Sequence, residues 1–384
     1  MDPLEWFFWI CVGIVAYTYI FYPIVLVILN ALVRGAGGSA AHSATAKSVS
    51  VLLPVYNEEQ NLPRRLDELK RMLPETGGEI IVISDASTDR SADIAREAGV
   101  RVIEMPTKSG KAAALNAAAA LAQHEFLVFA DARQRWADDA MARLIENFAD
   151  PTIGAVSGDL MLESAPGVLA GVGLYWRFEK WLRKQESRLG SQVGVTGAIS
   201  AVRRNLFVSI PPGTLLDDVY WPMHVVLQGH RVIHDERAKA YDRLPDKPKD
   251  EFRRKVRTLA GNFQLLTLLP VSALLPWSNR VWWQWISHKL MRLIVPWALL
   301  GMFVSSFLLR EDIYTIFFWV QTAVYGIALL GVIPALGRTL RLLGAAGSFL
   351  VLNAAAWVAF WVWITGRAGT SWHKVQYQET VHEA

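Results

Sequence analysis

Acidic side chains occur at two places where the sequence pattern points to chemistry. Asp131 directly follows the apolar run FLVFA, which predicts a buried strand ending at a carboxylate. Ligands of open α/β sheets bind at the carboxyl ends of strands, so Asp131 is a candidate ligand-binding residue. Asp is also a favoured helix cap, and a helix is expected to begin near Ala137. Capping is therefore the alternative interpretation of Asp131.

Asp217 and Asp218 form the second acidic place, ahead of a segment with a helical pattern. A carboxylate within hydrogen-bond reach of a hydroxyl can take its proton as the hydroxyl attacks another centre. Adjacent like charges raise a pKa, which helps a carboxylate to act as a base near neutrality. Asp218 is thus a candidate base, and Asp217 could instead cap the helix.

Lys111 follows Gly110 at the predicted start of an alanine-rich helix. Backbone N–H groups at a helix start attract phosphate together with a nearby cation, so Lys111 is a candidate phosphate-binding residue. Lys108 could share that role, and a solvated surface lysine is the alternative. Asp85 ends the predicted strand EIIVIS, and its carboxylate can only accept hydrogen bonds. It could bind the N–H edge of a ligand or cap a helix, although Asp89 suits the capping role better.

These side chains require a framework of alternating strands and helices. From residue 49 onward the pattern predicts strands at VSVLLPVY, EIIVIS, RVIEM and FLVFA, separated by helices at 58–72, 88–98 and 110–123. Such alternation predicts an α/β fold with a parallel sheet and right-handed crossovers. After Asp150 we expect strands at 153–160 and 193–202, a helix at 169–188 and the segment that begins with the paired aspartates.

The composition indicates a mixed protein with a soluble part and membrane spans. Of the 384 residues, 52% are hydrophobic and 19% are charged, too apolar for an ordinary soluble protein. Residues 6–33 carry no charge, and further apolar stretches lie at 293–309, 313–336 and 342–365. Arg338 and Arg341 lie between the last two stretches, which predicts a cytoplasmic loop there and a cytoplasmic middle region.

The predicted division of the chain has an anchor, a soluble domain and a membrane-bound end. It comprises a transmembrane anchor at 1–34, a linker at 35–47, a cytosolic α/β domain at 48–260, interfacial amphipathic helices at 261–285, three transmembrane helices at 286–366 and a tail at 367–384. The lone Cys11 permits no intrachain disulfide. The net charge of +4 is small and indicates no nucleic-acid partner.

Several motifs occur together in a recognisable order. They are PVYNEE at 54–59, ISDASTD at 83–89, GKAAALN at 110–116, the Asp131 strand, TGAISAVRR at 196–204 and LLDD at 215–218. In this order they resemble the family 2 glycosyltransferases over about residues 49–260. More narrowly, the chain resembles the membrane-embedded branch that includes cellulose, hyaluronan and poly-N-acetylglucosamine synthases. The resemblance implies a GT-A type, Rossmann-like domain, a UDP-sugar donor and inversion at the anomeric carbon.

The resemblance also implies roles for individual residues. The aspartate matching Asp85 accepts hydrogen bonds from the nucleobase, the lysine matching Lys111 lies near the diphosphate, and Asp131 would hold Mg²⁺ or Mn²⁺. Asp218 matches the second acidic residue of the Thr-Glu-Asp motif, the catalytic base. The predicted substrate-binding residues are Pro54, Tyr56, Glu58, Asp85, Lys111, Asp131, Arg133, Asp217, Arg254 and Arg257.

Two motifs depart from the family. The usual Asp-x-Asp is Asp131, Ala132, Arg133 here. One carboxylate with phosphate oxygens and water can still hold Mg²⁺, and Arg133 could instead pair with the diphosphate. The Gln-x-x-Arg-Trp motif of processive synthases is incomplete: Arg257 remains as a diphosphate-binding candidate, while the basic run around it could simply be a positive anchor beside the membrane.

The predicted function is transfer of a sugar from a UDP-sugar to a growing polysaccharide at a bacterial inner membrane, coupled to export. A lipid acceptor of the ceramide or polyprenyl type is the alternative, favoured by the few spans and the incomplete motif. A catalytically silent partner subunit is a third hypothesis, because the second metal carboxylate is missing. A homodimer or an export partner would complete a transfer path through so few helices.

Overall fold

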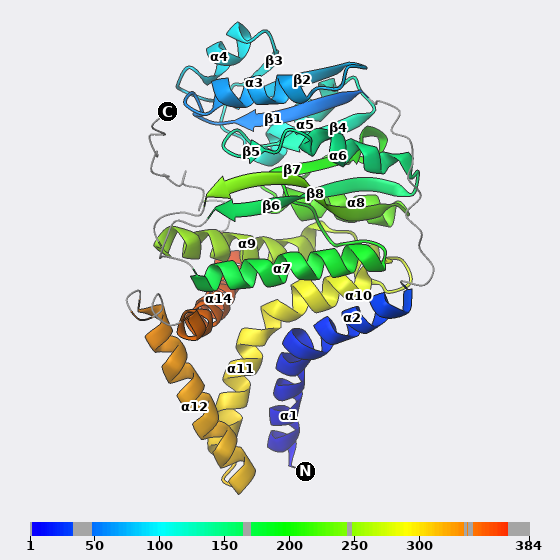
Figure 1. Cartoon of the computed structure of the whole chain (residues 1–384). Coiled ribbons are helices and arrows are strands. Elements are labelled where there is room, and N and C mark those ends of the chain that lie inside the picture. The colour runs from blue at the N-terminus through cyan, green and yellow to red at the C-terminus, as the bar shows by residue number, and fades with distance from the viewer. Residues whose placement is uncertain are drawn as a thin grey trace.

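The computed structural model describes residues 2–33, 48–163, 170–243, 248–333, 336 and 341–367. The predicted linker at 35–47 and the tail from 368 onward lie outside the described residues. Figure 1 shows a sheet domain above a layer of long helices, with the N-terminal end of the chain remote from the sheet.

One mixed sheet of eight strands forms the upper part of the molecule, in the order β3-β2-β1-β4-β7-β6-β8-β5. Strands β3, β2, β1 and β4 are parallel, which confirms the predicted parallel sheet for this half. Strand β7 then pairs antiparallel with both β4 and β6, while β6 and β8 are parallel. The strand bounds are β1 Val49–Val55, β2 Gly78–Asp85, β3 Arg101–Met105, β4 Phe126–Ala130, β5 Arg135–Trp136, β6 Ile153–Glu163, β7 Ile199–Arg203 and β8 Arg231–Arg243.

Helices cover both faces of this sheet, which explains the continuous apolar runs in its strands. Side chains alternate along a strand, so Leu52 of β1 packs into one core while Val51 and Leu53 pack into the other. The first core also contains the small side chains of α5, whose alanines permit close packing on the sheet. The helices of this part are α3 Leu62–Met72, α4 Ser91–Glu97, α5 Lys111–Leu121, α6 Ala140–Glu146, α7 Ala170–Leu189, α8 Asp217–Leu227 and α9 Pro248–Leu268.

Some predicted boundaries differ from the structure. The helix expected at 58–72 begins only at Leu62, because Asn57 has a positive φ of 54° in the turn that follows β1. The strand expected at 193–202 covers only Ile199–Arg203. The residues before it pass along the start of α8, where the Val195 amide donates to the Asp218 carbonyl at 2.8 Å. A Cβ on Gly194 would lie 2.9 Å from that carbonyl oxygen, so the close approach requires glycine there.

Four helical segments among the described residues are long and apolar enough to cross a membrane, which matches the number predicted. The segments are Pro3–Val33, Trp282–Leu308, Asp312–Val332 and Leu342–Ile364. The first comprises α1 Pro3–Ala16, the π-helix η1 Tyr17–Phe21 and α2 Tyr22–Val33. The second comprises α10 Trp282–Gln284, the π-helix η5 Trp285–Leu290 and α11 Met291–Leu308. The others are α12 Asp312–Val332 and α14 Arg341–Ile364.

Between the sheet and these helices lies a layer formed by α7 and α9 (Figure 1). The predicted domain boundary at residue 260 falls inside α9, and the 261–285 region contains the end of α9, the short η4 Val271–Leu274 and α10. Helix α2 packs on α7 through Leu26 and Leu182. The Tyr22 hydroxyl also donates to Glu186 Oε1 at 2.6 Å, and this buried bond joins the sheet domain to the first membrane-type segment.

Candidate active site

Lys111, Asp131 and Asp218 converge around Gly197. The Lys111 ammonium lies 2.8 Å from Asp131 Oδ1 and donates to the Gly197 carbonyl at 3.4 Å. A Cβ at position 197 would lie 3.4 Å from Lys111 Nζ and 3.8 Å from Asp218 Oδ2. Any side chain at this position would therefore meet both charged groups, and the glycine keeps the centre of the site open.

Three element ends bring these groups together. Strand β4 ends at Ala130, so Asp131 stands at the carboxyl edge of the sheet, as expected. Helix α5 begins at Lys111 after Gly110, which adopts a φ of 86° that favours glycine. Helix α8 begins at Asp217, and its first turn carries both paired aspartates. The site thus depends on the sheet edge and on two helix starts.

The electrostatics suit a carboxylate base. Burial and the neighbouring Asp217 charge raise the pKa of Asp218 to about 6, against the opposing effect of Arg183, Lys111 and Lys289. Burial also raises the pKa of Asp217, which Lys111 opposes. Burial disfavours the charged form of Lys111, but Asp131 and Asp217 outweigh it and raise the lysine pKa above its usual value. Lys111 therefore stays charged among the carboxylates.

Neither Asp131 nor Asp217 caps a helix, and Lys111 is not a solvated surface lysine. Helix α6 begins at Ala140 with Asp139 at its N-cap position, so the capping interpretation of Asp131 is wrong. Asp217 is the first residue of α8 and follows Leu216 at the N-cap position, so it is not the cap either. Lys111 is half-buried and paired with Asp131 at 2.8 Å, which is inconsistent with a solvated surface lysine.

Asp85 is buried at the end of β2, facing the loop before α5. Its carboxylate accepts the amide N–H groups of Ser109 at 2.7 Å and Gly110 at 2.9 Å. These bonds fix the loop that presents Lys111, so Asp85 positions the start of α5. A nucleobase contact by Asp85 stays a prediction. The Asp89 carboxylate accepts the amide of Ser91, the first residue of α4, at 3.0 Å, but Arg90 occupies the N-cap position, so Asp89 supports the helix start without being its cap.

The residues of the PVYNEE motif lie at the neighbouring end of β1. Pro54 belongs to β1, and Tyr56 and Glu58 lie in the turn beyond it. The Lys108 ammonium lies 3.7 Å from the centre of the Tyr56 ring, a cation–π contact. Glu58 Oε2 accepts from the Asn61 side chain at 2.8 Å. Because β1 and β2 are adjacent and parallel, these residues share one sheet edge with Asp85.

The predicted arginines have different surroundings. Arg133 forms a two-bond ion pair with Asp242 of β8, with Nε–Oδ1 at 3.0 Å and Nη2–Oδ2 at 2.6 Å. Arg254 forms a similar pair with Glu251 on α9, at 2.8 and 3.0 Å. Arg257 lies close enough to Asp217 to lower the pKa of that carboxyl. Arg257 therefore acts electrostatically on one of the central carboxylates.

The chemistry of the site fits a divalent metal bound mainly by a substrate. In the described parts of the chain, no group of three or more His, Cys, Asp or Glu residues is placed to hold a metal ion. Asp131 offers one carboxylate, about one third exposed, at the sheet edge. Mg²⁺ commonly takes one or two carboxylates and completes its shell with phosphate oxygens and water.

Sequence reasoning missed a buried charge cluster next to Asp218. Glu179 and Glu186 of α7 bond to opposite nitrogens of His288, at 2.9 and 2.7 Å. Glu179 also pairs with Lys289 at 3.0 Å, and Arg183 lies 3.5 Å from it. The signal was present, because charged residues inside an otherwise apolar segment such as 282–308 mark functional or structural pairs.

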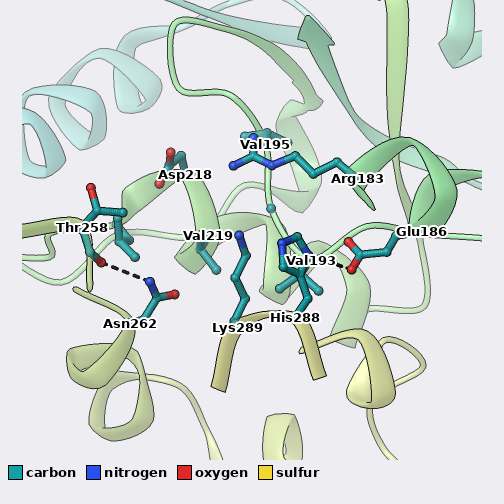
Figure 2. Close-up of a pocket in the computed structure, with 12 residues that line it drawn as sticks. Arg183, Glu186, Val193, Val195, Asp218, Val219, Thr258, Asn262, His288 and Lys289 are labelled. Carbon is teal, nitrogen blue, oxygen red and sulfur yellow. Dashed lines mark hydrogen bonds and ion pairs between the residues drawn. The ribbon is translucent and has the colours of Figure 1, made fainter. Parts of the chain in front are cut away.

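A cavity joins this cluster to the candidate base. It is lined by Arg183, Glu186, Val193, Gly194, Val195, Leu216, Asp218, Val219, Thr258, Asn262, His288 and Lys289. In Figure 2 the Arg183 and Lys289 side chains extend toward the space beside Asp218, and His288 faces Glu186. The site therefore has two sides, a sheet edge with Lys111 and Asp131 and a cationic cavity with Arg183 and Lys289.

The mixed Rossmann-like sheet is the GT-A fold of glycosyltransferases, flanked by apolar helices at both ends. The model of the glycosyl transferase family 2 matches residues 50–210, and this part of the chain is a domain of that family. The resemblance predicted from the motifs is thus confirmed for this domain, which is of the glycosyltransferase class.

The chain is similar to curated and solved relatives at low identity. It is 24% identical over 232 residues to the poly-beta-1,6-N-acetyl-D-glucosamine synthase of Staphylococcus aureus strain COL, covering 57% of this chain and 56% of that one. The Staphylococcus epidermidis enzyme of the same name is 24% identical over 233 residues, with the same coverage. The chain thus spans just over half the length of these relatives.

A solved structure extends the likeness in fold over nearly the whole chain. A mannosyltransferase from Pyrobaculum calidifontis, in complex with GDP-Man and Mn²⁺, superposes with a TM-score of 0.68 at 20% identity. The match covers 94% of this chain and 99% of that one. At this identity the likeness concerns the fold, including the arrangement of the flanking helices.

Proposed function

We propose that the protein transfers a sugar from a nucleoside diphosphate sugar to an acceptor hydroxyl, with inversion at the anomeric carbon. The observation that carries this proposal is the convergence of Lys111, Asp131 and Asp218 around Gly197. On one side, the Lys111 ammonium and the Asp131 carboxylate, which could hold a metal ion, are suited to binding a diphosphate. On the other side, the buried carboxylate of Asp218 has a raised pKa and is suited to act as a base.

In the proposed reaction the acceptor hydroxyl oxygen attacks the anomeric carbon from the face opposite the diphosphate. The bond from that carbon to the diphosphate oxygen breaks, the hydroxyl proton passes to Asp218, and the nucleoside diphosphate leaves. Lys111 and Arg257 would bind the diphosphate by charge. Asp85 would bind the nucleobase, and Pro54, Tyr56 and Glu58 would line the same edge.

A bound Mg²⁺ or Mn²⁺ would neutralise charge on the leaving diphosphate. Asp131 is the residue proposed to hold it, and Lys111 is at present paired with that carboxylate. The Mn²⁺ in the Pyrobaculum mannosyltransferase supports a divalent ion of this kind without distinguishing Mg²⁺ from Mn²⁺. The pairing of Arg133 with Asp242 weakens the idea that Arg133 replaces the metal.

The acceptor is proposed to be a growing polysaccharide at a bacterial inner membrane, with the catalytic domain in the cytoplasm and with coupled export. The names of the curated staphylococcal relatives support the polysaccharide acceptor. A lipid acceptor is the second candidate, because the cationic cavity beside Asp218 lies against the membrane-type segments. A UDP-sugar is the proposed donor, and the GDP-Man of the Pyrobaculum protein makes GDP-sugars the necessary comparison.

The test is release of UDP or GDP by the detergent-solubilised protein from a panel of UDP- and GDP-sugars, with Mg²⁺, Mn²⁺ or EDTA. We expect metal-dependent turnover of one donor that Asp218→Asn abolishes and that the surface control Asp93→Asn leaves intact. The size of the radiolabelled product separates polymer from lipid. If nucleotide binds normally but no donor turns over, the silent-subunit hypothesis replaces the enzyme.

A further inference from the structure

The cavity beside Asp218 is lined by two cationic side chains, Arg183 and Lys289, together with the carboxylates of Asp218 and Glu186. Glu179 alone interacts with Arg183 at 3.5 Å, His288 at 2.9 Å and Lys289 at 3.0 Å, and it also contacts Arg292. These cations hold the pKa of the Glu179 carboxyl well below its usual value, although burial opposes this. Charges are costly to bury unless opposite charge balances them. Arg183 and Lys289 share the single carboxylate of Glu179 with His288 and Arg292, so both can attract an additional anion in the cavity.

Glu186 is the second carboxylate that α7 contributes to the cluster, and it bonds to the His288 ring at the cavity. Its carboxylate accepts the Tyr22 hydroxyl at 2.6 Å and bonds to His288 Nδ1 at 2.7 Å, so it is engaged by two groups. Arg183 and Lys289 share Glu179 and extend toward the cavity, as Figure 2 shows. A guanidinium fork opposite a compact ammonium is a favourable arrangement for phosphate oxygens.

The cationic pair lies between the candidate base and the membrane-type segments. Both groups act electrostatically on Asp218, since their charges lower the pKa of its carboxyl against burial. Lys289 belongs to η5, which leads directly into α11, and Arg183 belongs to α7, on which α2 packs. A molecule with its anionic group at this pair could place a hydroxyl at Asp218 and an apolar tail along α2 and α11.

We propose that this cavity binds the phosphate of a lipid-linked acceptor, in which a sugar or polyol hydroxyl next to the phosphate faces Asp218. The inference rests on the proposed function and narrows its second acceptor candidate, a lipid, to one that carries a phosphate. In the transfer the acceptor hydroxyl loses its proton to Asp218 and gains the sugar, and the phosphate ester to the lipid stays intact. Arg183 and Lys289 are acceptor-binding residues in this scheme.

Equilibrium binding tests the inference without requiring turnover. Phosphatidylinositol in detergent micelles serves as the probe, because it has hydroxyls beside a lipid-linked phosphate. Its water-soluble headgroup, glycerophosphoinositol, and a neutral monoglucosyl diacylglycerol serve as comparisons. The proteins are the full chain, Arg183→Gln and Lys289→Gln. Lys180→Gln is the matched control, because Lys180 lies on the same helix α7 and pairs with Asp159 outside the cavity.

We expect phosphatidylinositol to bind tightest and each glutamine variant to weaken it about tenfold or more, with Lys180→Gln unchanged. Nucleotide binding, measured in the same samples, should be unaltered. If a glutamine variant also loses nucleotide binding, the charge-conserving variants Arg183→Lys and Lys289→Arg are measured instead. Phosphatidylinositol binding must persist in both of them if the cavity binds phosphate.

Equal binding of the neutral glycolipid, or phosphatidylinositol binding that no substitution of the pair alters, would overturn the inference. A headgroup that binds as tightly as the intact lipid would overturn its lipid part. Failure of the proposed function is seen separately, as absence of nucleotide release from every donor while this binding persists.

Discussion

The pKa of Asp218 is set by burial and by neighbouring charges of opposite effect. Burial and Asp217 raise its pKa to about 6, while Lys111 and Arg183 hold it from rising further. A base must be unprotonated to take the acceptor proton, so activity should be retained above this pKa and lost below it.

The first prediction is therefore a pH profile. We expect kcat/KM to fall as the pH decreases through about 6, with a plateau above it. Lys111→Met should move this limb to higher pH, because removal of the lysine charge raises the pKa of Asp218. The profile is measured by nucleotide release in buffers of constant ionic strength. A limb that keeps its position in Lys111→Met would contradict the proposed proximity of these two groups.

A second prediction concerns Arg133, for which the sequence allowed a diphosphate contact. Its bonds to Asp242 mean that Arg133→Ala leaves a buried carboxylate without its main cation. We expect a loss of about 1 to 3 kcal/mol in the free energy of unfolding, with donor KM nearly unchanged. Chemical denaturation and kinetics measure the two effects, and Arg90→Ala, an exposed ion-pair control, should change neither. A raised donor KM with unchanged stability would restore the diphosphate role.

The order of the motifs was sufficient to select Lys111, Asp131 and Asp218 as candidate site residues. Each of them follows a strand end or lies at the start of a helix with a local sequence signature. It could not identify Asp242 as the partner of Arg133, since the two residues are 109 positions apart. It also missed Arg183 and Lys289. Their proximity arises only when α7 packs against η5, a tertiary contact that local spacing does not encode.

At the scale of elements, strand β6 packs very closely against its neighbours at a glycine. It lies between β7 and β8, and its register shifts between Ser157 and Asp159. A Cβ on Gly158 would lie 2.7 Å from the Ala238 carbonyl oxygen and 2.8 Å from Ile199 Cγ1. The backbones therefore approach so closely that only glycine fits without displacement.

The third prediction follows from this contact. Gly158→Ala should lower the free energy of unfolding by about 1 to 3 kcal/mol, because β6 must move away from its neighbours. Thermal unfolding followed by tryptophan fluorescence measures it. Gly326→Ala in α12 is the matched control, because a Cβ there meets nothing within 4 Å. Equal stability of both variants would show that the strands can separate at little cost.

Among the elements, the parallel half of the sheet and strand β6 were predictable, whereas β5 and β8 were not. Strands β1, β2 and β4 are buried on both faces and give continuous apolar runs, which are a clear signal. Strand β8 carries many charged residues, such as Asp235 and Arg237, which pair with each other in the structure. Its sequence consequently reads as a polar surface segment, and its place beside β6 depends on tertiary pairing.

At the scale of the whole molecule, the sheet domain is held on the membrane-type helices by a few buried polar bonds. The Tyr22 hydroxyl of α2 donates to Glu186 of α7, and the Asn30 side-chain amide donates to the Gln185 carbonyl at 3.0 Å. His288 bonds to the same Glu186 from η5. These bonds orient the candidate active site relative to the segments that would cross the membrane.

The fourth prediction is that Tyr22→Phe loosens this junction. The variant removes a hydrogen bond to a charged, buried group, so we expect a loss of about 1 to 3 kcal/mol in the free energy of unfolding. Nucleotide binding should persist, because the sheet edge is untouched. Denaturant unfolding in detergent and nucleotide titration provide the measurements. The neighbouring, exposed Phe21→Leu is the control, and equal losses in both would assign the effect to general helix packing.

The two π-helices have a geometric consequence for the chain as a whole. Tyr17 of η1 bonds to Ser287 of η5 at 2.6 Å and accepts from the Trp283 indole at 2.9 Å, so the wide turns of both segments meet. An α-helix advances by about 100° per residue, and a π turn offsets that phase by one residue. Deleting a single residue from 285–290 would rotate His288 and Lys289 away from α7 while leaving α11 apolar. We therefore expect that segment to accept many substitutions more readily than any change in its length.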